Sequence, residues 1–134
     1  MRLIIGGYGQ GKLNYLLRET GLQKNQVVDG EQCELNQTSH CFALNHLHLY
    51  LRRLMEQGHD PQSIIEQMIT ENSDMIIVCD EVGCGIVPME PFEREWRETT
   101  GRICCMLAQR ATRVDRVFCG IATTIKEKNN EELE

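Results

Sequence analysis

Long apolar segments are absent from this sequence. Across its 134 residues, no apolar run approaches the roughly 20 residues that a helix needs to span a bilayer. The opening residues, Met1 to Ile5, are too few for the apolar region of a signal peptide, and no small-residue cleavage site follows them. We therefore expect a cytoplasmic protein without a membrane span.

An excess of positive charge is also absent. The formal net charge is -6 and the isoelectric point is near 5.2. Proteins that bind duplex nucleic acid neutralise its phosphates with a surplus of Lys and Arg, so this balance argues against a nucleic-acid partner. An acidic protein that binds phosphate groups must do so locally, with backbone amides and a few cations.

Paired cysteine motifs are the third absence. The cysteine count, 7, is odd, no C-x-x-C occurs, and no histidine spacing completes a zinc pattern. Cys79 and Cys119 fall inside apolar runs typical of strands, where a free cysteine packs as a small hydrophobic residue. We therefore expect reduced thiols rather than a structural metal or a disulfide. The cysteines are Cys33, Cys41, Cys79, Cys84, Cys104, Cys105 and Cys119.

The sequence does contain an alternation of strand-like and helical patterns. Short apolar runs predict strands over residues 2–6, 25–30, 73–81 and 114–125. Apolar residues at helical spacing predict helices over 12–20, 39–57 (with Ser39 as its cap), from Pro61 onward, and over 88–111. This alternation predicts one α/β domain over residues 1–125, with a mostly parallel sheet between helices in three layers. The charged residues 126–134 are expected to form a flexible tail.

A glycine-rich stretch, IGGYGQGKLN, separates the first predicted strand from the first predicted helix. It contains the pattern G-x-x-x-x-G-K, in which glycines let backbone N–H groups converge on an anion and the lysine reaches the outer phosphates. This context predicts a P-loop NTPase-like fold that binds ATP or GTP. The alternative is a tight strand-to-helix turn with an exposed lysine. The predicted nucleotide-binding residues are Gly6, Gly7, Tyr8, Gly9, Gln10, Gly11, Lys12 and Leu13.

Leu13 stands where such loops carry Ser or Thr. The hydroxyl at that position coordinates Mg²⁺, and a leucine cannot replace it. Asn14 has a carbonyl oxygen, but it points elsewhere because a helix turns by about 100° per residue. A metal would therefore depend on other ligands.

Asp80 and Glu81 are the candidate metal ligands, and with Lys12 the candidate catalytic residues. They end the apolar run MIIVCDE, and ligands of open α/β sheets bind at the carboxyl ends of the strands. Asp80 is predicted to hold Mg²⁺ directly or through water, and Glu81 to orient or deprotonate an acceptor hydroxyl. The alternative is a pair of solvated carboxylates.

The residues that follow form a candidate substrate loop. Its glycines permit a sharp turn at the same edge of the sheet, and its apolar residues give a wall against which a substrate can pack. Arginines at helical spacing follow, as phosphate ligands or as part of a solvated helix face paired with glutamates. The predicted substrate-contacting residues are Val82, Gly83, Gly85, Val87, Pro88, Arg94 and Arg97.

The four histidines give a weaker signal. His46 and His48 fall inside the helix predicted over 39–57, and His48 lies close to its apolar stripe, which favours a partly buried structural role. His40 and His59 lie at predicted helix ends, where either a structural or a functional role fits.

The run from Glu81 to Pro88, EVGCGIVP, resembles the E-V-G-x-G-I-V-P motif of the adenosylcobinamide kinase / adenosylcobinamide-phosphate guanylyltransferase family of cobalamin biosynthesis. Residues 94–102, REWRETTGR, are similar to that family's R-x-F-R-[DE]-x-x-G-R helix, with Trp96 for Phe. The loop from Gly6 to Lys12 resembles its T-G-G-x-x-S-G-K-S loop. The likeness covers roughly residues 1–18 and 76–122.

This resemblance implies two linked reactions on a corrinoid. The first phosphorylates the hydroxyl on the aminopropanol arm of adenosylcobinamide with ATP or GTP and Mg²⁺, and the second transfers GMP to that phosphate through a guanylylated histidine. The resemblance also implies a homotrimer whose small-molecule partners are nucleotides and corrinoids.

The sequence departs from the family in three places. Leu13 replaces the loop serine, Cys104 and Cys105 replace an Asn-Gln pair, and the shortened middle has no H-x-x-x-R-P segment. The alternative hypothesis is therefore a nucleotide- or corrinoid-binding regulatory protein that has lost catalysis. A P-loop enzyme acting on another small alcohol also fits the sequence.

Overall fold

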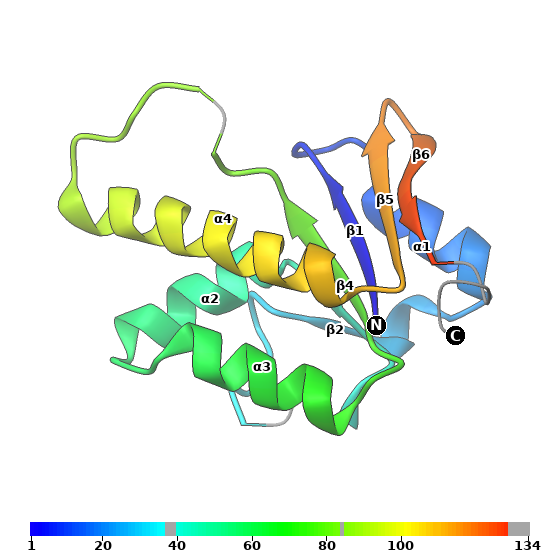
Figure 1. The fold of residues 1–134 in the computed structure, drawn as a ribbon, viewed down its shortest axis with the longest axis horizontal. Coiled ribbons are helices and arrows are strands. Elements are labelled where there is room, and N and C mark those ends of the chain that lie inside the picture. Colours follow the sequence, from blue (N-terminus) through cyan, green and yellow to red (C-terminus); the bar gives the residue numbers. More distant parts are fainter. Residues whose placement is uncertain (37–39, 84, 129–134) are drawn as a thin grey trace.

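The computed structural model describes residues 1–36, 40–83 and 85–128. They form a sheet of 6 strands with the order β2-β3-β4-β1-β5-β6 (Figure 1). The first 5 strands in this order run parallel and β6 is antiparallel to β5. The strands are β1 (Arg2–Gly6), β2 (Val27–Asp29), β3 (Ala43–Asn45), β4 (Ile76–Asp80), β5 (Arg113–Phe118) and β6 (Ile121–Glu127).

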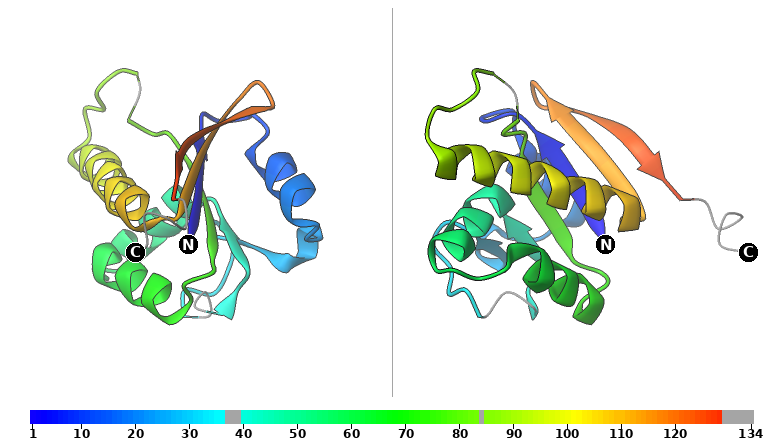
Figure 2. Two further views of the ribbon diagram at one scale, coloured as in Figure 1. Left: turned by 45° about the vertical axis from the view of Figure 1, so that its right-hand side comes forward. Right: turned by 60° about the vertical axis from the view of Figure 1, so that its left-hand side comes forward.

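Helices cover both faces of this sheet. One face carries the single helix α1, while α2, α3 and α4 lie on the other, and this layering is clearest when the molecule is turned (Figure 2). The helices are α1 (Lys12–Thr20), α2 (Leu47–Glu56), α3 (Pro61–Glu71) and α4 (Pro91–Arg110), with a short 3₁₀ helix, η1 (Lys24–Gln26), before β2. The predicted α/β fold with a mostly parallel sheet in three layers is confirmed.

The core has one part on each face of the sheet, as the alternation along β1 shows. Leu3 belongs to the larger cluster under α2, α3 and α4, whereas Ile4 belongs to the smaller cluster with Tyr15 and Leu16 of α1. Each fully buried aliphatic side chain contributes about 1.5–3 kcal/mol, so both faces fix the position of β1. The loop that follows β1 is therefore attached to a strand that is packed on both faces.

The helix predicted over 39–57 is wrong in its first part. Ala43, Leu44 and Asn45 form the buried strand β3, which pairs with β2 and β4, and the helix begins only at Leu47. Between the strand and the helix, His46 has a left-handed backbone with φ 58°, which turns the chain. A strand of 3 residues is too short to show the alternation typical of strands. Leu44 therefore fitted the helical spacing of the leucines that follow it. Ser39, the predicted cap, lies outside the described residues.

The single strand predicted over 114–125 is also wrong, because the chain forms a hairpin. Phe118 pairs with Ile121 across a two-residue turn in which Cys119 and Gly120 both have positive φ, 51° and 76°. Positive φ at both central positions is typical of a type I′ turn, which matches the twist of the strands. Cys119 is thus an exposed turn residue rather than part of a buried strand. Strand β6 continues to Glu127, inside the segment predicted as a tail, and residues 129–134 lie outside the described residues.

Candidate functional site

The glycine-rich loop joins β1 to α1 at the carboxyl edge of the sheet. Gly9 and Gly11 have left-handed backbones with φ 70° and 94°, and Gly11 occupies the cap position of α1. Gly11 offers no side chain to cap this end of the helix, so the first N–H groups of α1 remain available to an anion. This end of α1 therefore offers hydrogen-bond donors to a ligand.

This loop borders a pocket of about 410 Å³. Other parts of the wall come from the end of β4, which pairs with β1, and from the end of β3, the next strand beyond β4. The pocket is lined by Tyr8, Gly9, Gln10, Gly11, Lys12, Leu13, Asn14, Asn45, His46 and Asp80. Its wall includes six of the eight residues predicted to bind nucleotide.

Lys12 and Asp80 form an ion pair inside this pocket. Lys12 Nζ lies 2.6 Å from Asp80 Oδ1 and donates a hydrogen bond of 2.7 Å to the carbonyl oxygen of Gly7. Only 7% of Lys12 is exposed, so the alternative of a turn with an exposed lysine does not describe this loop. A buried cation beside the uncapped N-terminus of α1 makes the pocket suited to phosphate groups.

His48 orients Asp80 from the other side. Its Nδ1 accepts a hydrogen bond of 3.3 Å from the Asp80 backbone N–H, and its Nε2 lies 3.3 Å from Asp80 Oδ2. Burial lowers the pKa of His48 and outweighs the opposing effect of Asp80, while His46 and Lys12 lower it further. A neutral ring whose Nε2–H donates to the carboxylate satisfies both contacts. His48 was interpreted as a structural residue from the sequence, and the structure adds a direct contact with the site.

Glu81 points to a different partner. Arg116 of β5 donates two hydrogen bonds, of 2.9 Å and 3.1 Å, to the carboxylate of Glu81. The backbone N–H of Glu81 donates to the carbonyl oxygen of Gly6. Asp80 is the last residue of β4 and Glu81 follows the strand, and the two carboxylates are separated by their different partners, Lys12 and Arg116. The structure thus brings Asp80 to the loop pocket and places Glu81 beside Arg116.

The residues present fit a magnesium site only in part. Leu13 lines the pocket and offers no oxygen, and among the described residues of its wall Asp80 is the carboxylate. Next to the pocket, ligand atoms of Asp29, Glu31 and His46 all lie within 4.8 Å of one another, although His46 Nδ1 is already 2.8 Å from Asp29 Oδ1. A metal held by Asp80 would therefore need water or substrate oxygens for its other ligands.

The predicted substrate loop arches from the end of β4 to the start of α4 (Figure 1). Arg97 donates hydrogen bonds of 2.6 Å to the carbonyl oxygens of both Val82 and Ile86, and Arg94 donates to the carbonyl oxygen of Met89. These two arginines, predicted as phosphate or substrate ligands, therefore brace the loop. Gly83, Val87, Pro88, Arg94, Arg97 and Glu98 line a second pocket of about 290 Å³. Cys84 lies outside the described residues.

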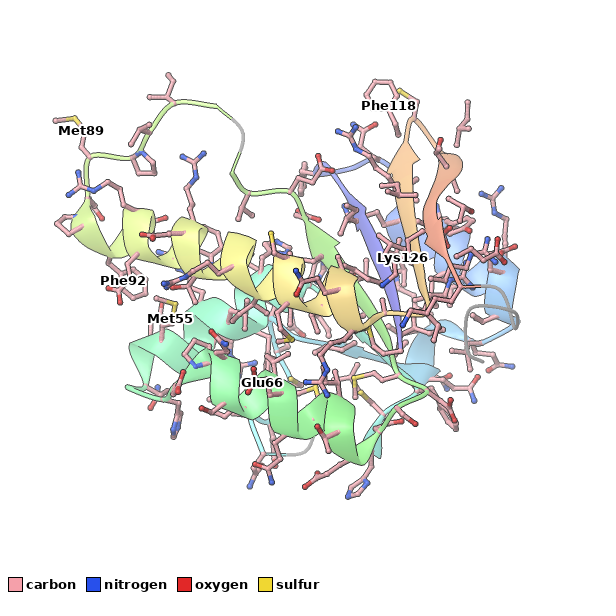
Figure 3. The ribbon with its side chains drawn as sticks, viewed as in Figure 1. Met55, Glu66, Met89, Phe92, Phe118 and Lys126 are labelled. Carbon is pink, nitrogen blue, oxygen red and sulfur yellow. The ribbon has the colours of Figure 1, made fainter. Side chains whose placement is uncertain are left out.

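Exposed apolar side chains lie on the arching loop and at the β5–β6 hairpin. Ile86, Val87 and Met89 of the arching loop are exposed, as are Phe118 and Ile121 beside the hairpin turn. Met89 and Phe118 project from opposite ends of the same edge of the molecule (Figure 3).

The hairpin turn also supports the glycine-rich loop, which the sequence did not predict. Gly120 donates its backbone N–H to the carbonyl oxygen of Gln10, and Cys119 donates to Gln10 Oε1, both at 2.8 Å. The sequence indicates this turn only by the pair Cys119-Gly120, which predicts a hairpin less strongly than the Asn-Gly or Asp-Gly pairs of common hairpins.

Gly6 is required by close packing against β5, which gives a stability prediction. A Cβ at this position would lie 2.5 Å from the carbonyl oxygen of Val117, whereas one at Gly101 of α4 has nothing within 4 Å. We expect Gly6→Ala to destabilise the protein by about 1–3 kcal/mol, and the control Gly101→Ala to stabilise it by about 0.5–1 kcal/mol. Urea unfolding measures both values, and equal stability of the two variants would contradict this packing.

Together these features define an α/β protein of the P-loop NTPase-like class. A sequence model of the cobinamide kinase / cobinamide phosphate guanyltransferase family (CobU) matches residues 18–125, which is most of the chain. The protein belongs to this family of transferases that act in cobalamin biosynthesis. The match begins after the glycine-rich loop, so the interpretation of that loop depends on its geometry. No curated protein matches the chain significantly. None of the helices among the described residues is long and apolar enough to cross a membrane.

Proposed function

We propose that this protein is a nucleotide-dependent kinase that phosphorylates adenosylcobinamide on the hydroxyl of its aminopropanol arm, with ATP or GTP as donor. The observation that carries the proposal is the buried Lys12–Asp80 ion pair in the loop pocket. Phosphoryl transfer needs positioning and charge stabilisation more than covalent chemistry, and this pocket supplies a cation, backbone amides and a carboxylate.

Each group of the pocket has a role in this proposal. The loop amides and the N-terminus of α1 bind the phosphates, and Lys12 exchanges its contact with Asp80 for one with the outer phosphate. Asp80, still oriented by the neutral His48, then accepts the proton of the acceptor hydroxyl. Bound Mg²⁺ would supply charge neutralisation of the phosphates, and Asp80 would hold it through water molecules.

In this proposal the exposed apolar residues of the arching loop bind the corrinoid that accepts the phosphoryl group. Ile86, Val87 and Met89 are exposed, which supports a role in packing against the apolar parts of a corrinoid. Arg97 keeps the loop in this shape through Val82 and Ile86.

The proposal is tested by the mass of the corrinoid product. Adenosylcobinamide is incubated with protein, Mg²⁺, ATP and GTP, and Lys12→Ala is compared with Lys24→Ala, an exposed lysine outside the pocket. We expect wild type and Lys24→Ala to add one phosphate and Lys12→Ala to add none. An unchanged corrinoid with nucleotide still bound would contradict the kinase activity. It would support a nucleotide- or corrinoid-binding regulator, the alternative that Leu13 suggests because it removes the metal-binding hydroxyl. A further gain of GMP would add guanylyl transfer to the activity.

Leu13 gives a prediction about the metal. Leu13→Thr restores a hydroxyl at the position that coordinates Mg²⁺ in related loops. We expect the Mg²⁺ concentration for half-maximal phosphorylation to fall by about tenfold, equivalent to about 1.4 kcal/mol. Leu13→Val, which has the same shape without the hydroxyl, is the matched control. An equal effect of Thr and Val would show that side-chain size, rather than metal coordination, sets the metal requirement.

A further inference from the structure

Two thiols from different elements meet directly behind the candidate site. Cys79 lies on β4 immediately before Asp80, and Cys104 lies on α4, which packs on the same face of the sheet (Figure 1). Their Sγ atoms are 3.6 Å apart. A disulfide has an S–S length of about 2.05 Å, so a small movement of one side chain would allow a bond to form.

The two thiols differ in their access to small reagents. Cys79 has no exposed surface. Cys104 is half-buried and lines a cavity of about 160 Å³ together with Asp80, Gly83 and Gly101. Because Gly83 and Gly101 are exposed, this cavity reaches the surface beside the arching loop. A small oxidant would therefore meet Cys104 first, with Cys79 behind it.

The thiolate is the reactive form of cysteine. Because Cys104 lines the cavity and Cys79 has no exposed surface, Cys104 is the sulfur that reacts first and Cys79 is the one that follows.

We propose that Cys79 and Cys104 are a redox modification site that a small hydroperoxide converts to a disulfide. The Cys104 thiolate attacks the peroxide, breaks its O–O bond and becomes a sulfenic acid, and the peroxide's other oxygen leaves as water after protonation. The Cys79 thiol then attacks the Cys104 sulfur, forms the S–S bond and releases a second water. Both sulfurs are oxidised by one electron each, and hydrogen peroxide is reduced to two waters.

The bond would tie β4 to α4 at the residue next to Asp80. The disulfide would therefore fix the backbone of Asp80 against α4. It would also narrow the cavity that Cys104 lines together with Val82 and Gly83. This modification does not depend on the reaction that the protein catalyses, so the two proposals fail separately.

Peptide mapping after oxidation tests the site. The Cys105→Ser variant is treated with hydrogen peroxide, blocked with an alkylating agent and digested with trypsin and a glutamyl endopeptidase. Cleavage after Glu81 separates Cys79 from Cys84, and cleavage after Arg102 releases the Cys104 peptide. We expect a linked Cys79–Cys104 peptide, lighter than the sum of its two parts by two hydrogen atoms, which a thiol reductant separates.

Cys105 is the matched control, because it neighbours Cys104 in sequence but is exposed on α4. Wild type and Cys105→Ser should both form the bond, and Cys104→Ser and Cys79→Ala should not. Cys104→Ser keeps Cys79 in place, so the test stands if Cys79→Ala folds poorly. Linkage of Cys79 to any other cysteine would overturn the proposal, as would oxidation of Cys104 beyond sulfenic acid while Cys79 remains alkylated.

Discussion

Asp80→Asn should lower phosphoryl transfer by about 10²- to 10³-fold while nucleotide binding is kept or strengthened. The carboxylate is 2.6 Å from Lys12 Nζ and 3.3 Å from His48 Nε2, and it is the carboxylate among the described residues that line the pocket, so it is the proposed proton acceptor. Asparagine preserves the shape but neither accepts a proton at neutral pH nor holds Lys12 in an ion pair. Lys12 is then released to the phosphates, which favours nucleotide binding.

The neighbouring carboxylate provides the matched control for this prediction. Glu81→Gln removes a charge at the next residue, but Glu81 is held by Arg116 rather than by Lys12. Turnover and nucleotide affinity are measured separately, by product formation and by titration calorimetry, with circular dichroism to show that each variant is folded. A larger loss of turnover in Glu81→Gln than in Asp80→Asn would reverse the roles of the two residues. Weaker nucleotide binding by Asp80→Asn would show that the ion pair supports the binding conformation of Lys12.

The elements that the sequence predicted correctly have strong local signals. The boundaries of β1 and α1 follow from an apolar run, a glycine-rich loop and the helix-ending Gly21, which are all contained in neighbouring residues. Asp80 was placed at the site because the carboxyl ends of parallel strands meet at one edge. That argument needs no knowledge of side-chain contacts.

The features that the sequence did not predict depend on contacts between distant residues. Strand β3 exists because β2 and β4 pair with it on both sides, and nothing within Ala43–Asn45 itself distinguishes a strand from a helix. The same error hid the position of His48, since a turn at His46 directs the start of α2 toward Asp80. The pairing of Glu81 with Arg116 joins residues 35 positions apart, so no local pattern indicates it.

Asp115→Asn should be the most destabilising of the polar substitutions predicted for this protein, at about 3 kcal/mol or more. Asp115 on β5 is 0% exposed. One of its oxygens accepts hydrogen bonds from Arg2 and Tyr15, and the other accepts from Arg113 and Thr124. An amide would present one oxygen in place of two and would place an NH₂ group against donors, leaving the guanidinium groups without their counter-ion.

The effect of Asp115 on stability should also depend on pH. Burial tends to raise the pKa of Asp115, but the hydrogen bonds from Arg2, Thr124 and Arg113 outweigh it and hold the pKa below its usual value. A lowered pKa in the folded state gives stability that is present above the unfolded value of about 3.9 and is lost as the pH falls through the folded value. The stability difference between wild type and Asp115→Asn should therefore be constant near neutral pH and should shrink below about pH 4.

Glu19 belongs to the same network and gives the control. It lies 3.2 Å from Arg2 and 3.7 Å from Arg113, but its side chain is much more exposed than that of Asp115. Exposed ion pairs contribute little, so Glu19→Gln should cost less than about 1 kcal/mol. Urea unfolding at several pH values measures both variants. Similar costs for the two substitutions would mean that the arginines, rather than the buried carboxylate, control the stability of this network. A small cost for Asp115→Asn alone would mean that β1, α1 and β5 are held together by the apolar contacts around Ile4.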